Sequence, residues 1–392
     1  MRIAISGIGI ISALGAGASR TIEALSAARS GISSSTAIVS SHLELPAGEI
    51  PLTNEQLALK LGIDGKRIIS RTALLGAIAA SEALDNARCG KDRRIALISG
   101  TSIGGMDLTE LFEKDSGKGP FSRLRYVRMH DCASSTRFIA DHCGITGYTS
   151  TISTACSSAM NAIIAGARLI RHNIADTVIA GGTDALSLFT LNGFNSLGIL
   201  DCNVCRPFDR NRNGLNLGEA AAYLVLQRED VLDSDPYCYL EGWGNANDAY
   251  HQTASSPNGD GAYMAMKKAL ETSGLETGRI DAIIAHGTGT PNNDAAETQA
   301  FVNLFGSNIP PFISTKAYTG HTLAASGSLN AVIACLCIKH GFLPASLNFN
   351  NPMDEGLPVP QSTFNNKIRI RNMLTNAFGF GGNCSSIILS AQ

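Results

Sequence analysis

An internal repeat constrains this chain more than any other feature. The segment ACSSAMNAIIA at residues 155–165 returns as AASGSLNAVIA at residues 324–334, with six of the eleven positions identical. A strand-like apolar run that ends in Gly-Thr precedes each copy, at Ile95–Thr101 and at Ala282–Thr288. Because the same elements recur in the same order, the sequence predicts two related halves.

Both copies of the repeat have the periodicity of helices. Apolar side chains recur every three or four positions, from Met160 to Ala167 and from Leu329 to Leu336. The second copy is apolar nearly all round, which predicts burial between two layers. Strand-like runs alternate with these helices, as at Thr149–Thr154, Val178–Ala180 and Pro311–Thr315. This alternation predicts an α/β fold in which helices cover a sheet.

We expect the two halves to be residues 1–240 and 241–392, each built from βαβ units, with a ligand site where they meet. A length of 392 residues suits two domains, and 44% hydrophobic residues exclude a disordered chain. The 31 Lys and Arg nearly balance the 33 Asp and Glu. Such a balance gives no global field for nucleic acid, so any basic contact must be local.

The sequence also argues against a membrane or metal protein. The longest apolar runs, such as Ala331–Ile338, fall well short of the roughly 20 residues of a membrane helix. Glycines interrupt the N-terminal run MRIAISGIGIISALGAG, which is interpreted as a strand rather than a signal peptide. Ten cysteines without regular spacing indicate cytoplasmic thiols, and the one CxxC pair, Cys202 and Cys205, lacks a second pair for zinc. We expect a cytoplasmic protein without cofactor or metal.

The two copies differ at one chemically important position. Cys156 in the first copy is matched by Ala325 in the second. Cys156 lies between a strand and a helix that begins near Ser157, so backbone N–H groups and the helix dipole are expected to favour its thiolate. The alternative is a buried and inert cysteine. We interpret Cys156 as a candidate nucleophile.

Two histidines occupy similar contexts in the second half. His286 opens the turn HGTGTP after a strand, and His321 precedes the buried second copy, five residues after Lys316. A single histidine would more often be a hydrogen-bonded core residue. A thiol with two imidazoles, however, predicts acyl transfer, in which one group holds an acyl chain and others stabilise an oxyanion.

A helix is expected to follow His286, with Asn293 as its cap and with Asp294 and Glu297 on one face. Acidic residues in a first turn complement the helix dipole without any other role. A carboxylate here could also fix Lys316, whose charge would be costly if buried. The tail NAFGFGG is a glycine-dense loop whose backbone could approach a reacting carbonyl.

Four blocks of the sequence resemble the signature blocks of the elongating β-ketoacyl-acyl-carrier-protein synthases, the Cys-His-His condensing enzymes of the thiolase superfamily. These blocks are TACSSAMNA, HGTGTPNNDAAET, STKAYTGHTLAASG and NAFGFGG, in the family's order. The resemblance extends from GIGIISALG to the final strand. It implies a thiolase-like fold with αβαβα layers and ping-pong decarboxylative condensation. It also implies a dimer with a continuous sheet, for which a homodimer is expected and a heterodimer stays open.

The resemblance implies roles for the motif residues. Cys156 would take the acyl chain from an acyl carrier protein, and the backbone N–H groups of Cys156 and Phe380 would form the oxyanion hole. His286 and His321 would hold the carbonyl of the malonyl-carrier thioester and promote loss of carbon dioxide. The residues that would order the histidine region are Lys316, held by Glu297, and Asp294.

The resemblance also implies substrate and partner contacts. Ile103 would line the acyl pocket, and Phe378 with Phe380 would gate its entrance. The acidic helix of the carrier protein would need a basic patch at the pocket mouth. The candidates for this patch are Lys66, Arg67, Arg71, Arg123, Arg125 and Arg206.

Departures from the family's pattern leave the substrate open. Asn383-Cys384 follows the last glycines where Thr-Asn is usual, residues 218–222 read GEAAA where the family has a GEGAG-like stretch, and Asn216 replaces an apolar residue. These changes put acyl chain length and the pathway in doubt, so a polyene or polyketide-like pathway is an alternative to fatty-acid synthesis.

Three other functions agree less well with the sequence. A non-catalytic chain-length-factor-like partner would typically lack the nucleophile that Cys156 provides. A thiolase proper would need a second catalytic cysteine, for which Cys384 qualifies by position only, and His321 argues against it. A Cys-His hydrolase would leave Lys316 and the second histidine without a role.

Overall fold

The structure is a computed structural model of the chain, and it describes residues 1–34, 45–64, 67–88, 94–115 and 124–392. Five strands of the first half pair in the order β1, β8, β7, β5 and β6. The pairs β1–β8 and β8–β7 are antiparallel, whereas β7–β5 and β5–β6 are parallel. The bounds are β1 Ile3–Ser12, β5 Ile95–Gly100, β6 Thr149–Ile152, β7 Thr177–Asp184 and β8 Ala220–Arg228.

Five strands of the second half pair in an equivalent order: β9, β13, β12, β10 and β11. Here too the first two pairs are antiparallel and the last two are parallel. The bounds are β9 Cys238–Asn247, β10 Ala282–Ile284, β11 Phe312–Ile313, β12 Asn372–Gly379 and β13 Asn383–Ser390. The matching order and directions confirm the duplication that the repeat predicted.

The two sheets join where β1 also pairs with β9, through residues Ile3–Ile5. A short strand, β2 (Gly15–Ala16), pairs with β1, and β3 (Ser33–Ser34) pairs separately with β4 (Pro46–Ala47). The predicted division at residue 240 falls within β9. The 3-10 turn η1 (Glu229–Val231) precedes this strand.

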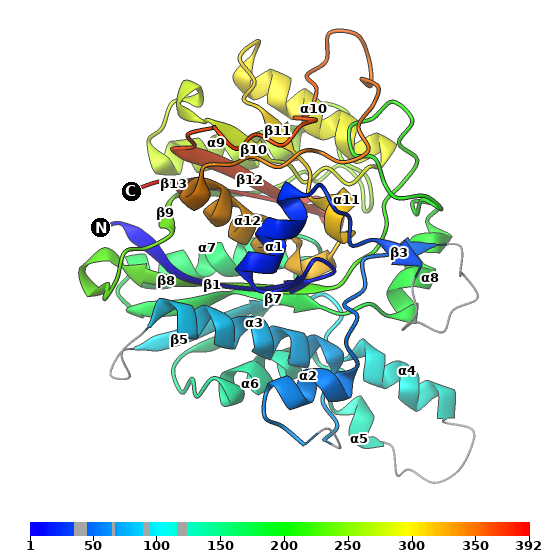
Figure 1. Cartoon of the computed structure of the whole chain (residues 1–392), viewed down its shortest axis with the longest axis vertical. Helices are drawn as coiled ribbons and strands as arrows, with labels where there is room; N and C mark the ends of the chain where they lie inside the picture. The colour runs from blue at the N-terminus through cyan, green and yellow to red at the C-terminus, as the bar shows by residue number, and fades with distance from the viewer. Residues whose placement is uncertain (35–44, 65–66, 89–93, 116–123) are drawn as a thin grey trace.

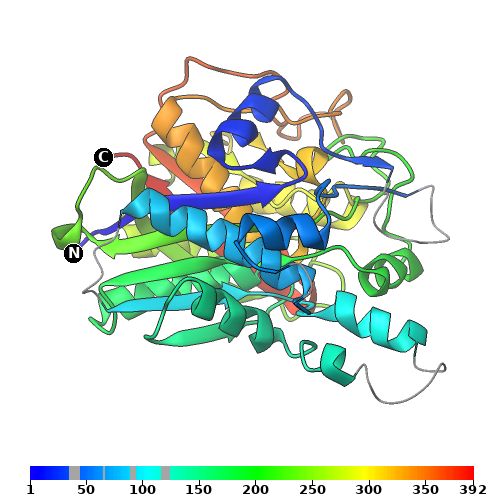
Figure 2. The same cartoon turned by 60° about the horizontal axis from the view of Figure 1, so that its bottom comes forward.

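Helices form three layers around the two sheets (Figure 1). Helix α3 (Arg71–Ala87) covers the outer face of the first sheet against β1, β8 and β7, as Figure 2 shows for β1. Helices α7 (Ser158–Arg171) and α12 (Ser326–His340) lie between the sheets and contact strands of both. Helix α9 (Asp260–Ser273) packs on β9 and β13, with α10 (Pro291–Phe305) against it. This arrangement confirms the expected αβαβα layers.

Shorter helices complete the described fold. Helix α2 begins with a capping box, in which the Thr53 side chain and Gln56 bond each other's backbone N–H groups. The bounds of the shorter helices are α1 Ala18–Ser26, α2 Asn54–Lys60, α4 Met106–Asp115, α5 Leu124–Val127, α6 Cys132–His142, α8 Leu188–Ser196 and α11 Lys316–Thr319. The 3-10 turns η2 (Thr277–Arg279), η3 (Leu323–Ala325) and η4 (Phe380–Gly382) connect other elements.

Helix α12 lies at the centre of the molecule. Every residue from Ser326 to Cys337 is buried, as expected for a helix that is apolar nearly all round. Within the described residues, the stretch Leu323–His340 is long and apolar enough to cross a membrane. It extends beyond the apolar run at residues 331–338, which by its own length is too short for a membrane helix. Because 89% of this stretch is buried inside the fold, it is a core helix.

Candidate active site

A tight turn between β6 and α7 positions Cys156. Ala155 has a left-handed backbone, with φ of 51°, which costs a non-glycine residue roughly 1–2 kcal/mol. Side-chain hydrogen bonds hold this turn: Ser158 Oγ donates to the carbonyl of Ala155 at 2.6 Å, and Ser157 Oγ donates to that of Thr154 at 2.8 Å. The sulfur therefore sits at the start of α7, as predicted.

His321 comes from the connection between β11 and α12 and reaches the sulfur. Its Nε2 lies 3.0 Å from Cys156 Sγ. Its backbone N–H donates to the carbonyl of Asn216 at 2.7 Å, and Gly218 N–H donates to the carbonyl of His321 at 3.0 Å. This bridge connects the histidine to the first half of the chain, so the two halves meet at the nucleophile.

Asn216, the polar departure from the family's pattern, has a structural role. Its side-chain oxygen accepts from Cys205 N–H at 2.7 Å, and its amide nitrogen donates to the carbonyls of Asp201 and Asn203. The side chain thus organises the loop that precedes it and does not line the cavity. The substitution therefore gives no indication of a polar substrate.

Glu297 on α10 holds His286 at the end of β10. One carboxylate oxygen accepts from His286 N–H and the other from Gly287 N–H, both at 2.8 Å. Asn376 adds a donor at 3.0 Å. The rings of His286 and His321 meet edge to face with centroids 5.4 Å apart. The two imidazoles therefore share one wall of the site.

Lys316 is buried beside the histidines, but its contact differs from the expected one. Its Nζ donates to Ser326 Oγ at 2.8 Å, and among the described residues no ion pair within 4.0 Å joins it to Glu297. Glu297 binds backbone N–H groups instead, so the expectation of a direct Lys316–Glu297 contact was wrong. Burial lowers the pKa of Lys316 to about 8, although Cys156 and Glu297 favour its charge.

The electrostatics of the site favour neutral groups. Burial raises the pKa of Cys156 to about 12, outweighing the opposing effects of Lys316 and of the N–H groups of Cys156 and Phe380. Burial, together with the charge of Lys316, lowers the pKa of His286 and that of His321 well below the usual value. These directions favour a thiol and neutral imidazoles, whereas the helix start was expected to favour a thiolate.

Asp294 supports the loop in front of α10. Its carboxylate accepts from Phe208 N–H at 2.7 Å and from Gly289 N–H at 3.2 Å, and burial raises its pKa. The helix begins at Pro291 with Thr290 as its N-cap, so Asn293 lies inside the helix and is not the expected cap. Proline at the first helical position explains the earlier start.

A cavity of about 240 Å³ brings the candidate catalytic residues together. Cys156, His286 and His321 line it, together with Phe378 and Phe380. The Phe378 ring lies 5.6 Å from the His286 ring. Other lining residues are Ile199, Leu215, His251, Thr288, Thr290, Asn292 and Cys384. The three reactive groups therefore share one enclosed space, as the sequence predicted.

Sequence reasoning missed Phe194 on α8. Its ring stacks on Phe380 at 5.7 Å and meets His321 edge to face at 6.5 Å. Nothing in the local pattern around Phe194 distinguishes it from other half-buried aromatic residues. It joins Phe378 and Phe380 at the cavity wall only through the fold.

Sequence reasoning also missed Asp184 at the end of β7. Its carboxylate accepts from Thr101 Oγ1 and from the N–H groups of Ser102, Ile103 and Ala324. Burial raises its pKa to about 6. Asp184 therefore fastens the Ile103 loop to the segment just after His321. Ile103 is buried in an apolar cluster near Leu323 and does not line the cavity.

The structure describes four of the six residues of the predicted basic patch. Lys66 and Arg123 lie outside the described residues. Arg67 and Arg125 are exposed, and Arg206 is half-buried. Arg71 does not fit a surface role, because it is buried and its guanidinium binds Glu219, with Nη2 at 2.6 Å and Nε at 2.8 Å.

No metal site is found among the described side chains: no group of three or more His, Cys, Asp or Glu is placed to hold an ion. The nine described cysteines are free thiols. Within the cavity, the thiol of Cys156 is the one in contact with an imidazole, that of His321.

Comparisons with known proteins place this site in a known family. The family's "Beta-ketoacyl synthase, N-terminal domain" matches residues 1–231, and the "Beta-ketoacyl synthase, C-terminal domain" matches residues 237–350. The chain is 31% identical to the 3-oxoacyl-[acyl-carrier-protein] synthase 2 of Coxiella burnetii, over 99% of this chain and 98% of that protein.

Solved structures share the fold. The ketosynthase ApeO in complex with its chain length factor ApeC, from Xenorhabdus doucetiae, matches with 31% identity and a TM-score of 0.86, over 100% of this chain and 98% of the other. The ishigamide ketosynthase/chain length factor matches with 29% identity and a TM-score of 0.91, over 100% and 99%.

Proposed function

The chain belongs to the β-ketoacyl synthase family of condensing acyltransferases, and on this premise we propose that it joins an acyl chain to a malonyl unit with loss of carbon dioxide. The reaction would be a ping-pong condensation through an acyl-cysteine. The observation that carries the proposal is the 3.0 Å contact between Cys156 Sγ and His321 Nε2, with His286 in the same cavity.

The first half-reaction loads the acyl chain onto Cys156. The sulfur attacks the acyl thioester carbonyl, and the N–H groups of Cys156 and Phe380, which face the sulfur, stabilise the oxyanion. His321 accepts the thiol proton at Nε2 and passes it to the departing carrier thiol. A neutral imidazole is needed for this step, which agrees with the lowered pKa of His321.

The second half-reaction forms the carbon–carbon bond. The neutral imidazole N–H of His286 donates to the carbonyl of the malonyl thioester, and His321 adds a second donor in the tautomer that carries its proton on Nε2. The bond to the carboxylate breaks, carbon dioxide leaves, and the electron pair forms an enolate held by these donors. The enolate carbon attacks the acyl carbonyl on Cys156. Collapse of that intermediate releases the product and the Cys156 thiolate, which takes a proton from solvent.

The expected partner is an acyl carrier protein, in acyl and malonyl forms, because relatives are named for acyl-carrier-protein substrates. Arg67, Arg125 and Arg206 remain candidates for its contact surface, whereas Arg71 is left out. The cysteine thiols agree with a cytoplasmic enzyme. The two halves, divided just before β9, would act as the domains that carry the thiol and the histidines.

A homodimer is our proposal, with a heterodimer as the second candidate because two solved relatives contain a ketosynthase and a chain length factor. The nucleophile Cys156 favours the catalytic member of such a pair. Product analysis identifies the acyl primer that the protein prefers. The primer in turn distinguishes a fatty-acid pathway from a polyene or polyketide-like pathway.

The test is a two-stage incubation with an acyl-carrier protein and then malonyl-carrier protein, followed by mass spectrometry. We expect an acyl adduct on the peptide that contains Cys156, followed by a β-ketoacyl product. Cys156→Ala should give neither, whereas Cys384→Ala, a matched control in the same cavity wall, should give both.

Three results would contradict the proposal. A covalent acyl-enzyme in Cys156→Ala would show that the nucleophile is wrong. Free acid as the main product would indicate a hydrolase. Condensation that appears only after addition of a second condensing subunit, while the isolated protein forms no acyl adduct, would indicate a chain-length-factor-like partner.

A further inference from the structure

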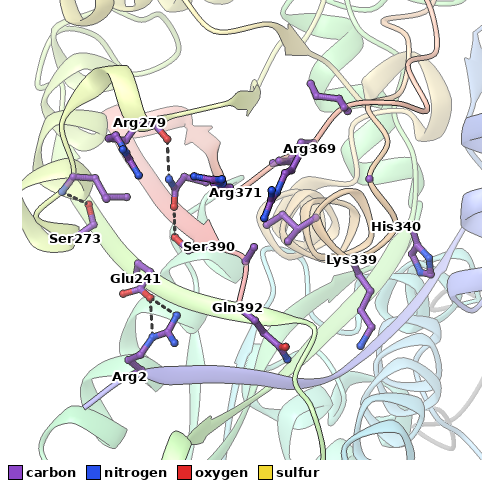
Figure 3. A pocket seen from close by; sticks show the side chains of 17 residues that line it. Arg2, Glu241, Ser273, Arg279, Lys339, His340, Arg369, Arg371, Ser390 and Gln392 are labelled. Atoms are coloured by element: carbon purple, nitrogen blue, oxygen red, sulfur yellow. Dashed lines mark hydrogen bonds and ion pairs between the residues drawn. The ribbon is translucent and has the colours of Figure 1, made fainter.

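A basic hollow lies at the start of β12 (Figure 3). It has a volume of about 900 Å³. Segments that are distant in sequence line it, among them the start of β1, the η2 turn, the end of α12, the segment that leads into β12 and the end of β13. Strand β12 begins here at Asn372 and ends beside Cys156 at Gly379. At roughly 3.3 Å per residue, the hollow is about 23 Å from the nucleophile.

The hollow gathers positive charge without matching negative charge. The cations of its lining are Arg2, Arg279, Arg369, Arg371 and Lys339. The single side-chain carboxylate of the lining, Glu241, already binds Arg2 at 3.0 Å. Within the described part of the chain, no carboxylate lies within 4.0 Å of the guanidinium groups of Arg279, Arg369 or Arg371. The excess is local, because the whole chain has a formal net charge of −2.

Lys339 has a structural role in the fold itself. It occupies the last turn of α12, where positive charge complements the helix dipole. Lys339 also lies over the ring of Tyr237 at 4.7 Å. Neither role applies to Arg279, Arg369 or Arg371, which we call the arginine triad.

The backbone under the arginine triad is fixed, although its charged ends are not paired. Asn372 Nδ2 donates to the carbonyl of Arg279 at 2.8 Å, and Asp281 accepts from the backbone N–H groups of Arg371 and Asn372 at 2.7 and 2.8 Å. Ser390 Oγ donates to the side-chain oxygen of the same Asn372 at 2.7 Å. The nearby carboxylate of Asp281 therefore holds the backbone rather than a guanidinium group.

Two members of the triad lie in the segment KIRIRN at residues 367–372, which orients their side chains. Burial alternates along it: Ile370 and Asn372 are buried, whereas Arg369 and Arg371 are exposed. Alternate residues of an extended segment point to the same face, so the two arginines lie side by side, roughly 7 Å apart. In Figure 3 both lie on the same side of the hollow as Arg279, with Lys339 and Gln392 across from them.

We propose that this hollow binds a small ligand with two or more phosphoryl groups, of the nucleoside diphosphate class. Guanidinium groups bind phosphate oxygens in pairs, and three of them without carboxylate partners provide donors for adjacent phosphates. Partly exposed apolar side chains, Leu275, Ile338 and Ile368, line the same hollow and can contact a ring. The volume falls in the range of small-molecule sites. The proposal does not depend on the condensation reaction.

The test measures binding of three probes by isothermal titration calorimetry: ADP, inorganic pyrophosphate and adenosine. We expect ADP and pyrophosphate to bind, and to bind more weakly as salt is raised from 50 to 200 mM, whereas adenosine does not bind. Arg369→Ala/Arg371→Ala should raise the dissociation constant of ADP by about tenfold or more. Both side chains are exposed, so this variant should keep the melting temperature and the condensing activity of the wild type.

A charge-matched control is Arg168→Ala/Lys367→Ala, which removes two exposed cations outside the hollow and should bind ADP as the wild type does. The proposal is overturned if neither ADP nor pyrophosphate binds at about 1 mM. It is also overturned if the triad variant and the control lose affinity equally. A polyglutamate peptide that binds the triad where pyrophosphate does not would assign the surface to an acidic protein instead.

Discussion

The two repeated strand–turn–helix units share a scaffold but not a chemistry. In the first, Asn161 on α7 donates to Thr154 Oγ1 at 2.9 Å, and in the second, Thr315 Oγ1 donates to Asn330 on α12 at 2.7 Å. Each helix is thus fastened to the end of the strand before it by an asparagine–threonine bond. The units differ at the helix start, where Cys156 in one corresponds to Ala325 in the other.

The connections explain how the roles separated. Residues 153–157 connect β6 to α7, whereas residues 314–325 connect β11 to α12. The longer connection carries Lys316 and His321. One copy therefore presents the candidate nucleophile on a tight turn, and the other has extra residues that bring an imidazole and a lysine close to it. The duplicated strand–turn–helix units thus give both halves the same backbone arrangement. The longer loop, residues 314–325, adds the side chains that face Cys156.

The strongest test of this division exchanges the two positions. Cys156→Ala/Ala325→Cys should lose condensation by about 10⁴-fold or more, because no imidazole is placed at position 325. Product formation and the acyl adduct are both measured by mass spectrometry. Ala325→Cys alone keeps Cys156 and should still condense. An acyl adduct on the peptide containing position 325 would mean that the two units are chemically interchangeable.

The histidines should separate the two half-reactions. His286→Ala should slow decarboxylation by about 10²–10³-fold, as loss of an oxyanion donor does, while Cys156 is still acylated. His321→Ala should slow both steps, because His321 contacts the sulfur directly. Acyl-enzyme formation and release of carbon dioxide are followed separately. The assignment is reversed if His286→Ala, and not His321→Ala, blocks acylation.

Glu297 should give the second half a distinctive pH dependence. Burial raises its pKa from 4.5 to about 7, so its contribution to stability is full below about pH 4.5 and is lost as pH rises through 7. Relative to Glu297→Gln, the wild type should therefore lose about 3 kcal/mol of unfolding free energy over this interval. Urea unfolding from pH 4 to 8 measures the difference.

The exposed Glu276→Gln is the control for that experiment, since it should show no comparable trend. A constant difference between wild type and Glu297→Gln across the range would mean that the Glu297 carboxyl has no raised pKa. A lower activity of Glu297→Gln at constant stability would still fit its bonds to the backbone of His286 and Gly287.

The smallest predicted effect is a difference in the stability lost when Asn330 or Asn161, the two asparagines of the repeated units, is replaced by alanine. Asn330 is fully buried and also donates to the carbonyls of Ala285 and Asn376, so Asn330→Ala should cost about 2–3 kcal/mol. Asn161 is only half-buried, and Asn161→Ala should cost about 1 kcal/mol. Denaturant midpoints measure both. Equal losses would mean that the two units contribute alike to stability.

Much of this fold could be predicted because the repeat preserves local order. Apolar spacing is a signal that a single short segment contains. It predicted the strands before each copy, the helices α7 and α12, and the burial of α12. Cys156, His286 and His321 could be found for a similar reason: each adjoins a glycine-rich or small-residue turn at the end of a strand. The duplication also predicted that these three residues, which come from the two related halves, would meet in one cavity.

The remaining features depend on partners that are distant in sequence. Lys316 bonds Ser326 rather than Glu297, and Arg71 is neutralised by Glu219, because tertiary packing decides which polar groups meet. Asp184 and Phe194 carry no local signal and gain their roles only from the loops packed on them. The burial that raises the pKa of Cys156 likewise depends on the folded interior and cannot be seen in the local sequence.

The central position of α12 has a consequence for the independence of the two halves. This helix belongs to the second half by sequence, yet it packs on strands of both sheets and is covered on every side. A fragment that ends before β9 would expose the part of its sheet that α12 covers, chiefly on β8, and the complementary fragment would expose the apolar surface of α12. Neither half is therefore expected to fold without the other. We expect either fragment, produced alone, to aggregate.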